Sequence, residues 1–216
     1  AETDYFFSRT ALMYVYMGHM KFEHTQPYEN WFWKKNKIHL KKGYVKSIDT
    51  TSKTLHFSEG DQLQYDKLVI ATGSKPSNLP FIELDKERII TSTEALKLKE
   101  IPKHMIVIGG GVVGLELGQV YRRLGAEVTV VEYMDRIIPT MDATMSKELM
   151  KSMKKLGVKF LTSHKVKEVT RKGKVVTVKA DDKKGQEVSL EADYCLVSVG
   201  RIPYTDKLGL DKAGVK

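Results

Sequence analysis

The hydrophobic pattern along the chain falls into two parts that meet near residue 84. Between Ile38 and Ala71 apolar residues occur in short alternating segments, a period typical of half-buried strands. The strands predicted there are Gly43–Ile48, Lys53–Phe57 and Gln62–Gln64. Glu59-Gly60-Asp61 lies between the last two and predicts a hairpin turn. The stretch Ser74–Leu84 holds two prolines and is typical of a connection, so we place the main domain boundary there.

Beyond that boundary, apolar runs of strand length alternate with segments of helical period. Strands are predicted at Met105–Ile108, Val128–Val131, Val158–Leu161 and Tyr194–Val199, and helices from Ser92 onward, at Val112–Leu124 and at Ala143–Leu156. Three shorter strands, Lys165–Thr170, Lys174–Ala180 and Glu187–Leu190, predict an antiparallel meander before the last strand. The alternation of strands and helices indicates a parallel sheet. The expected fold class is α/β, with a Rossmann-like domain that combines a parallel sheet, helices and a meander.

A glycine-rich turn lies between the first of these strands and the next helix. Its residues are Gly109-Gly110-Gly111-Val112-Val113-Gly114-Leu115-Glu116. In the pattern Gly-x-Gly-x-x-Gly, the first glycine permits the tight bend, the second lets the backbone approach a pyrophosphate, and the third lets the helix pack closely on the strand. The N-terminus of the helix would offer N–H groups and partial positive charge to phosphates. The motif, in this context, predicts a dinucleotide site.

An acidic residue, Glu132, ends the second strand about 18 residues beyond Gly114, near the spacing of ~20 residues expected for a ribose-binding acid. A carboxylate there would accept hydrogen bonds from both ribose hydroxyls and repel a 2′-phosphate, which favours NAD over NADP. Arg136 leaves NADP open, because arginine can neutralise a 2′-phosphate. The alternative for Glu132 is an ordinary exposed acid at a strand end.

Composition excludes several classes of protein. The chain has 216 residues, of which 41% are hydrophobic and 29% charged, which is typical of a globular protein. The longest apolar run, Ala11–Met17, is too short to span a bilayer, and the start of the chain has no basic region of a signal peptide, so we expect no membrane association and a cytoplasmic location. The single cysteine, Cys195, excludes an intramolecular disulfide or a dithiol pair, and we expect an inert buried thiol.

The formal net charge is +9, and much of it comes from residues 151–190, which hold twelve basic and four acidic residues. A basic cluster can bind nucleic acid, but these residues are scattered over several elements with one aromatic, Phe160, among them. A solvated basic face is therefore favoured over a nucleic-acid site. None of the six histidines has the spacing of a metal site, so no metal is predicted.

Three motifs together resemble the pyridine nucleotide–disulfide oxidoreductase family: Leu68–Pro76, Gly109–Glu116 and Ala192–Pro203. Members of this family bind FAD and carry an NAD domain inserted into the FAD domain. From about residue 88 onward the chain is most similar to the dihydrolipoamide dehydrogenase branch, and residues 1–80 to the NADH oxidase and nitrite reductase branch. Tyr5–Leu12 is similar to a segment that lines the flavin there.

The resemblance implies two domains: a partial FAD-binding domain at residues 1–84, to which 204–216 return, and an NAD-binding domain at 85–203. It implies that the glycine turn holds the NAD pyrophosphate, Glu132 the adenosine ribose and Val166 the adenine, and that Gly200 approaches the nicotinamide. It also implies that Thr72, Gly73, Ser74 and Val45 contact FAD. No catalytic residue is assigned, although Glu116 resembles an acid near the nicotinamide–flavin contact; its alternative role is a carboxylate favoured by the helix dipole.

The resemblance also implies that the chain is the middle of a longer homodimeric enzyme that transfers hydride between NADH and flavin. The first FAD motif, the paired redox cysteines and the C-terminal dimerisation domain of such enzymes have no counterpart in these 216 residues. We therefore expect the isolated chain to bind NAD without turnover and to self-associate through exposed apolar surface. The alternatives are a non-catalytic dinucleotide-binding module and a basic nucleic-acid-binding protein.

Overall fold

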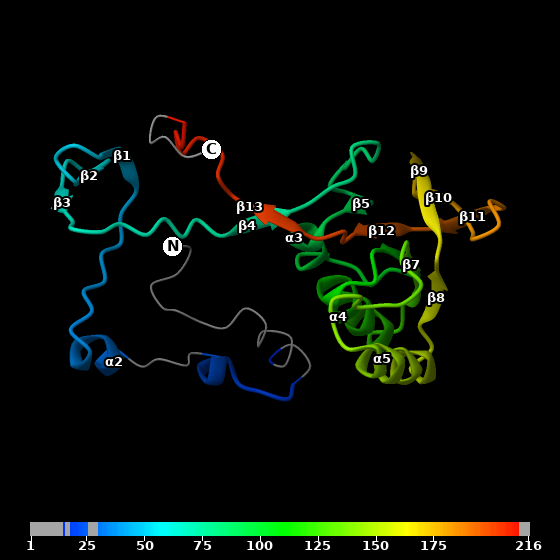
Figure 1. The fold of residues 1–216 in the computed structure, drawn as a ribbon. Helices are drawn as coiled ribbons and strands as arrows, with labels where there is room; N and C mark the ends of the chain where they lie inside the picture. The colour runs from blue at the N-terminus through cyan, green and yellow to red at the C-terminus, as the bar shows by residue number, and fades with distance from the viewer. Residues whose placement is uncertain (1–14, 16–17, 26–29, 212–216) are drawn as a thin grey trace. The chain divides into compact units, whose positions relative to one another are not determined.

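The structure is a computed structural model, and it describes residue 15 and residues 18–25 and 30–211. Its contacts divide the chain into two units, residues 1–71 with 206–216 and residues 72–205 (Figure 1). Residues 72–84, expected with the first domain, thus belong to the second unit. The flavin-like segment Tyr5–Leu12 lies outside the described residues.

The first unit contains an antiparallel sheet in the order β1-β2-β3. Its elements are η1 (Phe22–Thr25), α2 (Asn30–Lys35), β1 (Val45–Asp49), β2 (Thr54–Phe57) and β3 (Gln62–Gln64). The three predicted strands are confirmed to within two residues. The turn between β2 and β3 is also confirmed: Gly60 has φ +92°, a conformation that favours glycine.

The apolar run Leu68–Ala71 forms no strand, and the side chain of Val69 is 85% exposed. Of the large apolar side chains that the structure describes in this unit, Leu55 and Phe57 on β2 are buried, whereas Tyr44 and Leu40 are exposed. The first unit therefore buries a small core and leaves several apolar side chains in water.

The second unit is built on a five-stranded, entirely parallel sheet in the order β5-β12-β6-β7-β8. The strands are β5 (Ile89–Ile90), β6 (His104–Ile108), β7 (Glu127–Glu132), β8 (Lys159–Thr162) and β12 (Tyr194–Val197), and the helices are α3 (Ser92–Ala95), α4 (Val112–Arg123) and α5 (Ala143–Lys155). The helix predicted from Ser92 begins after a capping box, in which the Thr91 side chain accepts from the backbone of Thr93 and Glu94 accepts from the backbone of Thr91.

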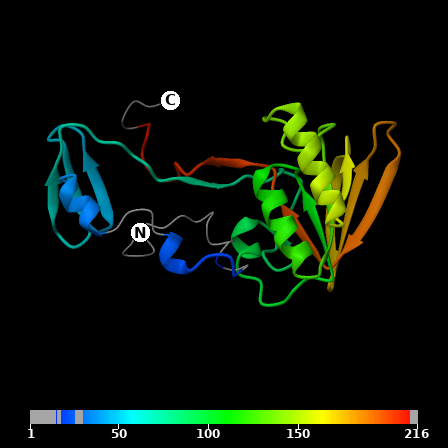
Figure 2. The ribbon, with the colours of Figure 1, turned by 90° about the horizontal axis from the view of Figure 1, so that it is seen from below.

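The sheet lies between the helices on one face and an antiparallel meander on the other (Figure 2). The meander consists of β9 (Lys165–Lys172), β10 (Val175–Asp181) and β11 (Glu187–Ala192). Successive residues of β6 point to opposite faces: Met105 and Val107 pack with the helices, and Ile106 and Ile108 with the meander. The sheet is buried on both faces, which explains its β-branched runs. The predicted α/β class, with parallel sheet and meander, is confirmed.

The chain order places β7 on one side of β6 and β12 on the other. In an open parallel sheet, the point where the strand order reverses leaves a crevice beyond the carboxyl ends of the strands. The ends of β6 and β12 therefore mark the position at which a ligand would bind.

A short ribbon, which the sequence analysis missed, pairs β4 (Ser74–Pro76) with β13 (Arg201–Pro203). The strands are antiparallel, with Pro203 opposite Ser74 and Arg201 opposite Pro76. At its far end, the Tyr204 N–H donates to the Gly73 carbonyl at 2.9 Å. The chain enters the second unit through β4 and leaves it after β13, so both ends of the unit lie at this ribbon.

Candidate dinucleotide site

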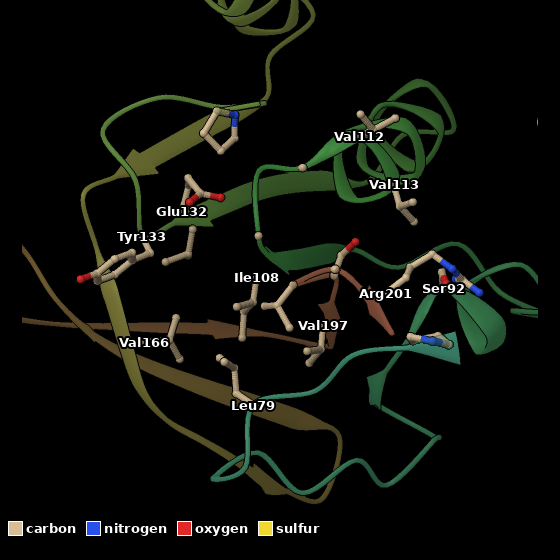
Figure 3. Close-up of a pocket in the computed structure, with 18 of the residues that line it drawn as sticks. Leu79, Ser92, Ile108, Val112, Val113, Glu132, Tyr133, Val166, Val197 and Arg201 are labelled. Carbon is tan, nitrogen blue, oxygen red and sulfur yellow. The ribbon is translucent and has the colours of Figure 1, made fainter. Parts of the chain in front are cut away.

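A cavity of ≈ 590 Å³ lies in the crevice beyond β6, β7 and β12 (Figure 3). Its lining includes Gly109, Gly111, Val112 and Val113 from the glycine turn and α4, Glu132 from β7, Val166 from β9, and Val197, Gly200 and Arg201 from the last strands. The structure thus brings part of the glycine turn, Glu132, Val166 and Gly200 together around one cavity. Gly110, Gly114, Leu115 and Glu116 do not line it.

The first and third glycines of the motif are required by packing. Gly109 has φ +103°, and a Cβ there would lie 2.4 Å from the Ser198 carbonyl oxygen. A Cβ on Gly114 would lie 2.5 Å from the Gly109 carbonyl oxygen and 3.0 Å from Cγ1 of Val107. Both approaches are too short for any larger residue. These two glycines therefore let the turn bend and let α4 lie against β6.

The second glycine, Gly111, differs from both neighbours in the motif. A Cβ built on it meets no atom within 4 Å among the described residues, so protein packing does not require glycine there. Gly111 is the N-cap of α4 and lines the cavity, and no described side chain caps the helix. The bare backbone leaves room for a ligand to approach the N–H groups of the first helical turn.

Glu132 holds the glycine turn in place. Its Oε2 accepts from the Gly110 N–H at 2.5 Å, and its Oε1 accepts from the Met134 N–H at 2.7 Å. The side chain is only 8% exposed, so the alternative of an ordinary exposed acid is wrong. A carboxylate can accept about four hydrogen bonds, so both oxygens keep acceptor capacity toward the cavity.

Arg136, which kept NADP open, points elsewhere. Its Nη2 donates to the Pro139 carbonyl at 2.8 Å, and the residue does not line the cavity. The basic side chains at this end of the cavity are instead those of Lys165 and His164, which follow β8 and which the sequence analysis missed. The His164 Nδ1 lies 2.7 Å from the Thr162 carbonyl. The topology could have found them, because β8 lies next to β7 and their carboxyl ends meet at one edge.

The residues that the family resemblance connects with FAD are not among those that line the cavity. Thr72 donates to the Tyr204 carbonyl at 2.6 Å, and Ser74 Oγ accepts from Arg201 Nε at 2.7 Å, so both stabilise the ribbon. Val45 lies on β1 of the first unit and is 38% exposed. Glu116 lies on α4, where burial raises the pKa of its carboxyl.

Other chemistry is limited. Among the residues that the structure describes, no group of three or more His, Cys, Asp or Glu could hold a metal, and no helix is long and apolar enough to cross a membrane. Cys195 is fully buried, and burial raises the pKa of its thiol.

The basic segment of residues 151–190 is partly neutralised within the fold. Lys167 pairs with Asp181 and Glu187, and Lys179 with Glu168. Lys159 lies against Glu127 of the neighbouring strand. These pairs favour the solvated basic face over a continuous basic surface for nucleic acid.

Comparison with known protein sequences agrees with the family resemblance seen in the sequence motifs. The chain is 42% identical over 189 residues to dihydrolipoyl dehydrogenase 3 of Pseudomonas putida, an alignment that covers 86% of this chain and 41% of that protein. The chain therefore spans about two fifths of the length of this curated relative.

Solved structures agree on the fold. LpdA from Mycobacterium tuberculosis matches with a TM-score of 0.65 and 31% identity, covering 83% of this chain and 39% of that one. The water-forming NADH oxidase from Lactobacillus brevis matches with a TM-score of 0.69 and 24% identity, covering 93% and 46%. The family of pyridine nucleotide-disulphide oxidoreductases matches residues 1–216. The chain belongs to the pyridine nucleotide-disulphide oxidoreductase family.

Proposed function

We propose that the second unit binds NAD(H), with the pyrophosphate on the glycine turn, the adenosine ribose on Glu132 and the adenine against Val166. The observation that carries this proposal is the contrast among the glycines: Gly109 and Gly114 are required by packing, whereas Gly111 faces open space in the cavity. A glycine at a position where no protein atom would contact a Cβ leaves room for the close approach of a phosphate.

In the complete enzyme, the bound NADH would supply a hydride to FAD. This chain's residues would bind and orient the dinucleotide, with Gly200 at the nicotinamide side, and exclude water around it. Thr72, Gly73, Ser74 and Val45 are the residues that the family resemblance assigns to FAD, and Glu116 the acid that it assigns to the nicotinamide–flavin contact. We also propose that the thiol substrate of the complete enzyme is dihydrolipoamide, as in the dihydrolipoamide dehydrogenase branch that the chain resembles.

A second candidate is a dinucleotide-binding module without turnover. The sequence holds a single Gly-x-Gly-x-x-Gly, and the described part of the first unit offers a three-stranded antiparallel sheet rather than a second strand–turn–helix unit. For the isolated chain we propose this behaviour: a colourless protein that binds NADH. Retained flavin colour that NADH bleaches would favour the complete activity instead.

The test is a fluorescence titration of the full chain with NADH and, in parallel, NADPH. We expect saturable binding that is at least about tenfold tighter for NADH, because the Glu132 carboxylate repels a 2′-phosphate. A tenfold difference in affinity corresponds to about 1.4 kcal/mol of binding free energy. Absence of saturable binding of either would overturn the proposal. Salt-sensitive binding to duplex DNA would instead favour the nucleic-acid alternative.

A further inference from the structure

We propose that Ile138, on the loop between β7 and α5, is a positioning residue for the diphosphate. Its backbone N–H fixes the peptide between Gly110 and Gly111, so that the N–H of Gly111 is presented to a phosphate oxygen. This inference rests on the proposed function and deepens it, because it gives a role to a residue outside the glycine motif. It is carried by a strained backbone conformation and by one hydrogen bond.

The backbone of Ile138 is strained. Its φ is +39°, in the left-handed region that β-branched side chains disfavour. Among the non-glycine residues of positive φ that the structure describes, Ile138 alone is both β-branched and buried. Pro139 follows it, and a residue before proline normally has an extended backbone. Such a conformation persists only where the surrounding contacts determine it.

Those contacts come from the loop itself and from α5. The carbonyl of Ile137 accepts from the buried Ser146 Oγ at 2.7 Å, and the carbonyl of Ile138 accepts from the Met141 N–H at 2.9 Å. The side chains of Ile137 and Ile138 both pack in the core on the helix side of the sheet. The loop is therefore fixed on both sides of the strained residue.

The strained residue contacts the glycine turn directly. The N–H of Ile138 donates to the Gly110 carbonyl at 2.8 Å, and the N–H of Gly110 donates to Glu132. Glu132 thus fixes the peptide before Gly110, and Ile138 fixes the peptide after it. Packing is equally close, because a Cβ on Gly110 would lie 3.1 Å from Oε2 of Glu132 and 3.1 Å from Cγ2 of Ile137.

This hydrogen bond determines where the N–H of Gly111 points. In a trans peptide the C=O and the N–H point in opposite directions, so the Gly111 N–H points away from Ile138. Gly111 lines the cavity, and its N–H has no hydrogen-bond acceptor among the described residues. A donor that is oriented before the ligand arrives loses little entropy on binding. A rotated peptide would instead present its carbonyl oxygen, which repels a phosphate.

The experiment measures the affinities of ADP, NADH and adenosine for the full chain and for an ester analogue at Ile138. Suppression of a stop codon introduces the α-hydroxy acid that corresponds to isoleucine, which keeps the side chain and replaces the backbone N–H by an oxygen. We expect ADP and NADH to bind roughly tenfold more weakly, as for loss of one hydrogen bond to a charged group. Adenosine, which has no phosphate, should bind within about twofold of the unmodified chain, as measured by NMR titration.

Two further variants are matched controls. An ester analogue at Met141 removes a backbone hydrogen bond of the same loop that does not reach the glycine turn. Ile138→Gly keeps the N–H and accepts a φ of +39° without strain, but it loses a buried side chain and should lower the melting temperature. In both controls we expect the ratio of the adenosine and ADP dissociation constants to stay within about twofold.

This ratio separates positioning from a merely structural role, because a damaged fold would weaken all three ligands alike. Unchanged ADP binding by the Ile138 ester analogue, or an equal loss for adenosine and ADP, would overturn the inference. A change of the ratio in either control as large as in the Ile138 ester analogue would also overturn it. Failure of the unmodified chain to bind ADP or NADH would overturn the proposed function itself.

Discussion

The N–H of Gly110 and the carboxylate of Glu132 are joined by a hydrogen bond of 2.5 Å across the ends of β6 and β7. The same carboxylate accepts from Met134 on the loop that follows β7. One buried side chain therefore stabilises two backbone segments and faces the proposed ribose position. Its substitution should affect folding and ligand binding together.

Glu132→Gln should lower the free energy of unfolding by about 1–3 kcal/mol, because one of the two backbone N–H groups that it accepts from would meet an amide NH₂ instead of an oxygen. The measurement is urea denaturation followed by circular dichroism. Glu127→Gln is the control at the exposed start of the same strand, where loss of the contact with Lys159 should cost no more than about 1 kcal/mol. Equal effects of the two substitutions would contradict the buried role of Glu132.

Gly111→Ala and Gly114→Ala should separate binding from folding. Gly114→Ala places a Cβ 2.5 Å from a backbone oxygen and should destabilise the second unit by several kcal/mol. Gly111→Ala meets no described atom, so the melting temperature should stay within a few degrees while NADH affinity falls at least about tenfold. Gly118→Ala, whose Cβ would make ordinary contacts at 3.5 Å, is the control for helical glycine and should be neutral or stabilising. Unchanged NADH binding by Gly111→Ala would remove the argument for a phosphate at that position.

The Cys195 thiol should be unreactive in the folded protein. It is fully buried in β12, and burial raises the pKa of the thiol, so little thiolate is present at neutral pH. Titration with a disulfide reagent should detect no thiol in the native protein and one thiol per chain in denaturant. Rapid modification under native conditions would show that β12 opens readily.

Stability should fall at acid pH in part through Asp85. Burial raises the pKa of this carboxyl, but three backbone N–H groups and the Arg171 guanidinium outweigh that effect and leave the pKa below its usual 3.8. A depressed pKa in the folded state contributes stability above the unfolded value and loses it as pH falls through the folded value. The difference in melting temperature between the unmodified chain and Asp85→Asn should be largest near neutral pH and should shrink as the pH falls below the usual pKa of 3.8. A difference independent of pH would contradict this assignment.

The isolated chain should self-associate as its concentration rises. Val69, Tyr44 and Leu40 in the first unit are 85%, 76% and 63% exposed, which favours association of apolar surface. Light scattering should show an increasing average mass, and Val69→Lys should reduce it. Val175→Lys, on the meander, is the control of equal charge. A monomeric mass at all concentrations would contradict the prediction.

Much of the second unit could be predicted from the sequence because local and global signals agree. The β-branched runs of β6 and β7, the glycine turn between β6 and α4, and the acid that ends β7 each have a short-range pattern and a fixed place in the fold. The strands β10 and β11 alternate with period 2, so most of the meander was equally visible. In β9 the buried residues Val166 and Val169 are three positions apart.

The rest depends on contacts far apart in the sequence. The ribbon of β4 and β13 joins residues about 127 positions apart, through the bonds of Arg201 to Ser74, and no local period marks it. Likewise, Lys165 and His164 reach the cavity only because β8 lies beside β7. The run Leu68–Ala71 has the composition of a buried strand, but the described residues provide no sheet that pairs with it.

The second unit begins and ends at the same place. Its first residues, Thr72 and Gly73, are joined by two hydrogen bonds to Tyr204, the residue before its last, so the entry and the exit of the chain are held side by side. A unit whose two ends lie next to each other can be inserted into a loop of a host protein without distorting that loop. It can also be deleted if a short linker joins the two cut ends of the host chain. The ribbon thus gives the second unit the geometry of a modular insert, and we expect this unit to fold when it is transplanted into an unrelated scaffold.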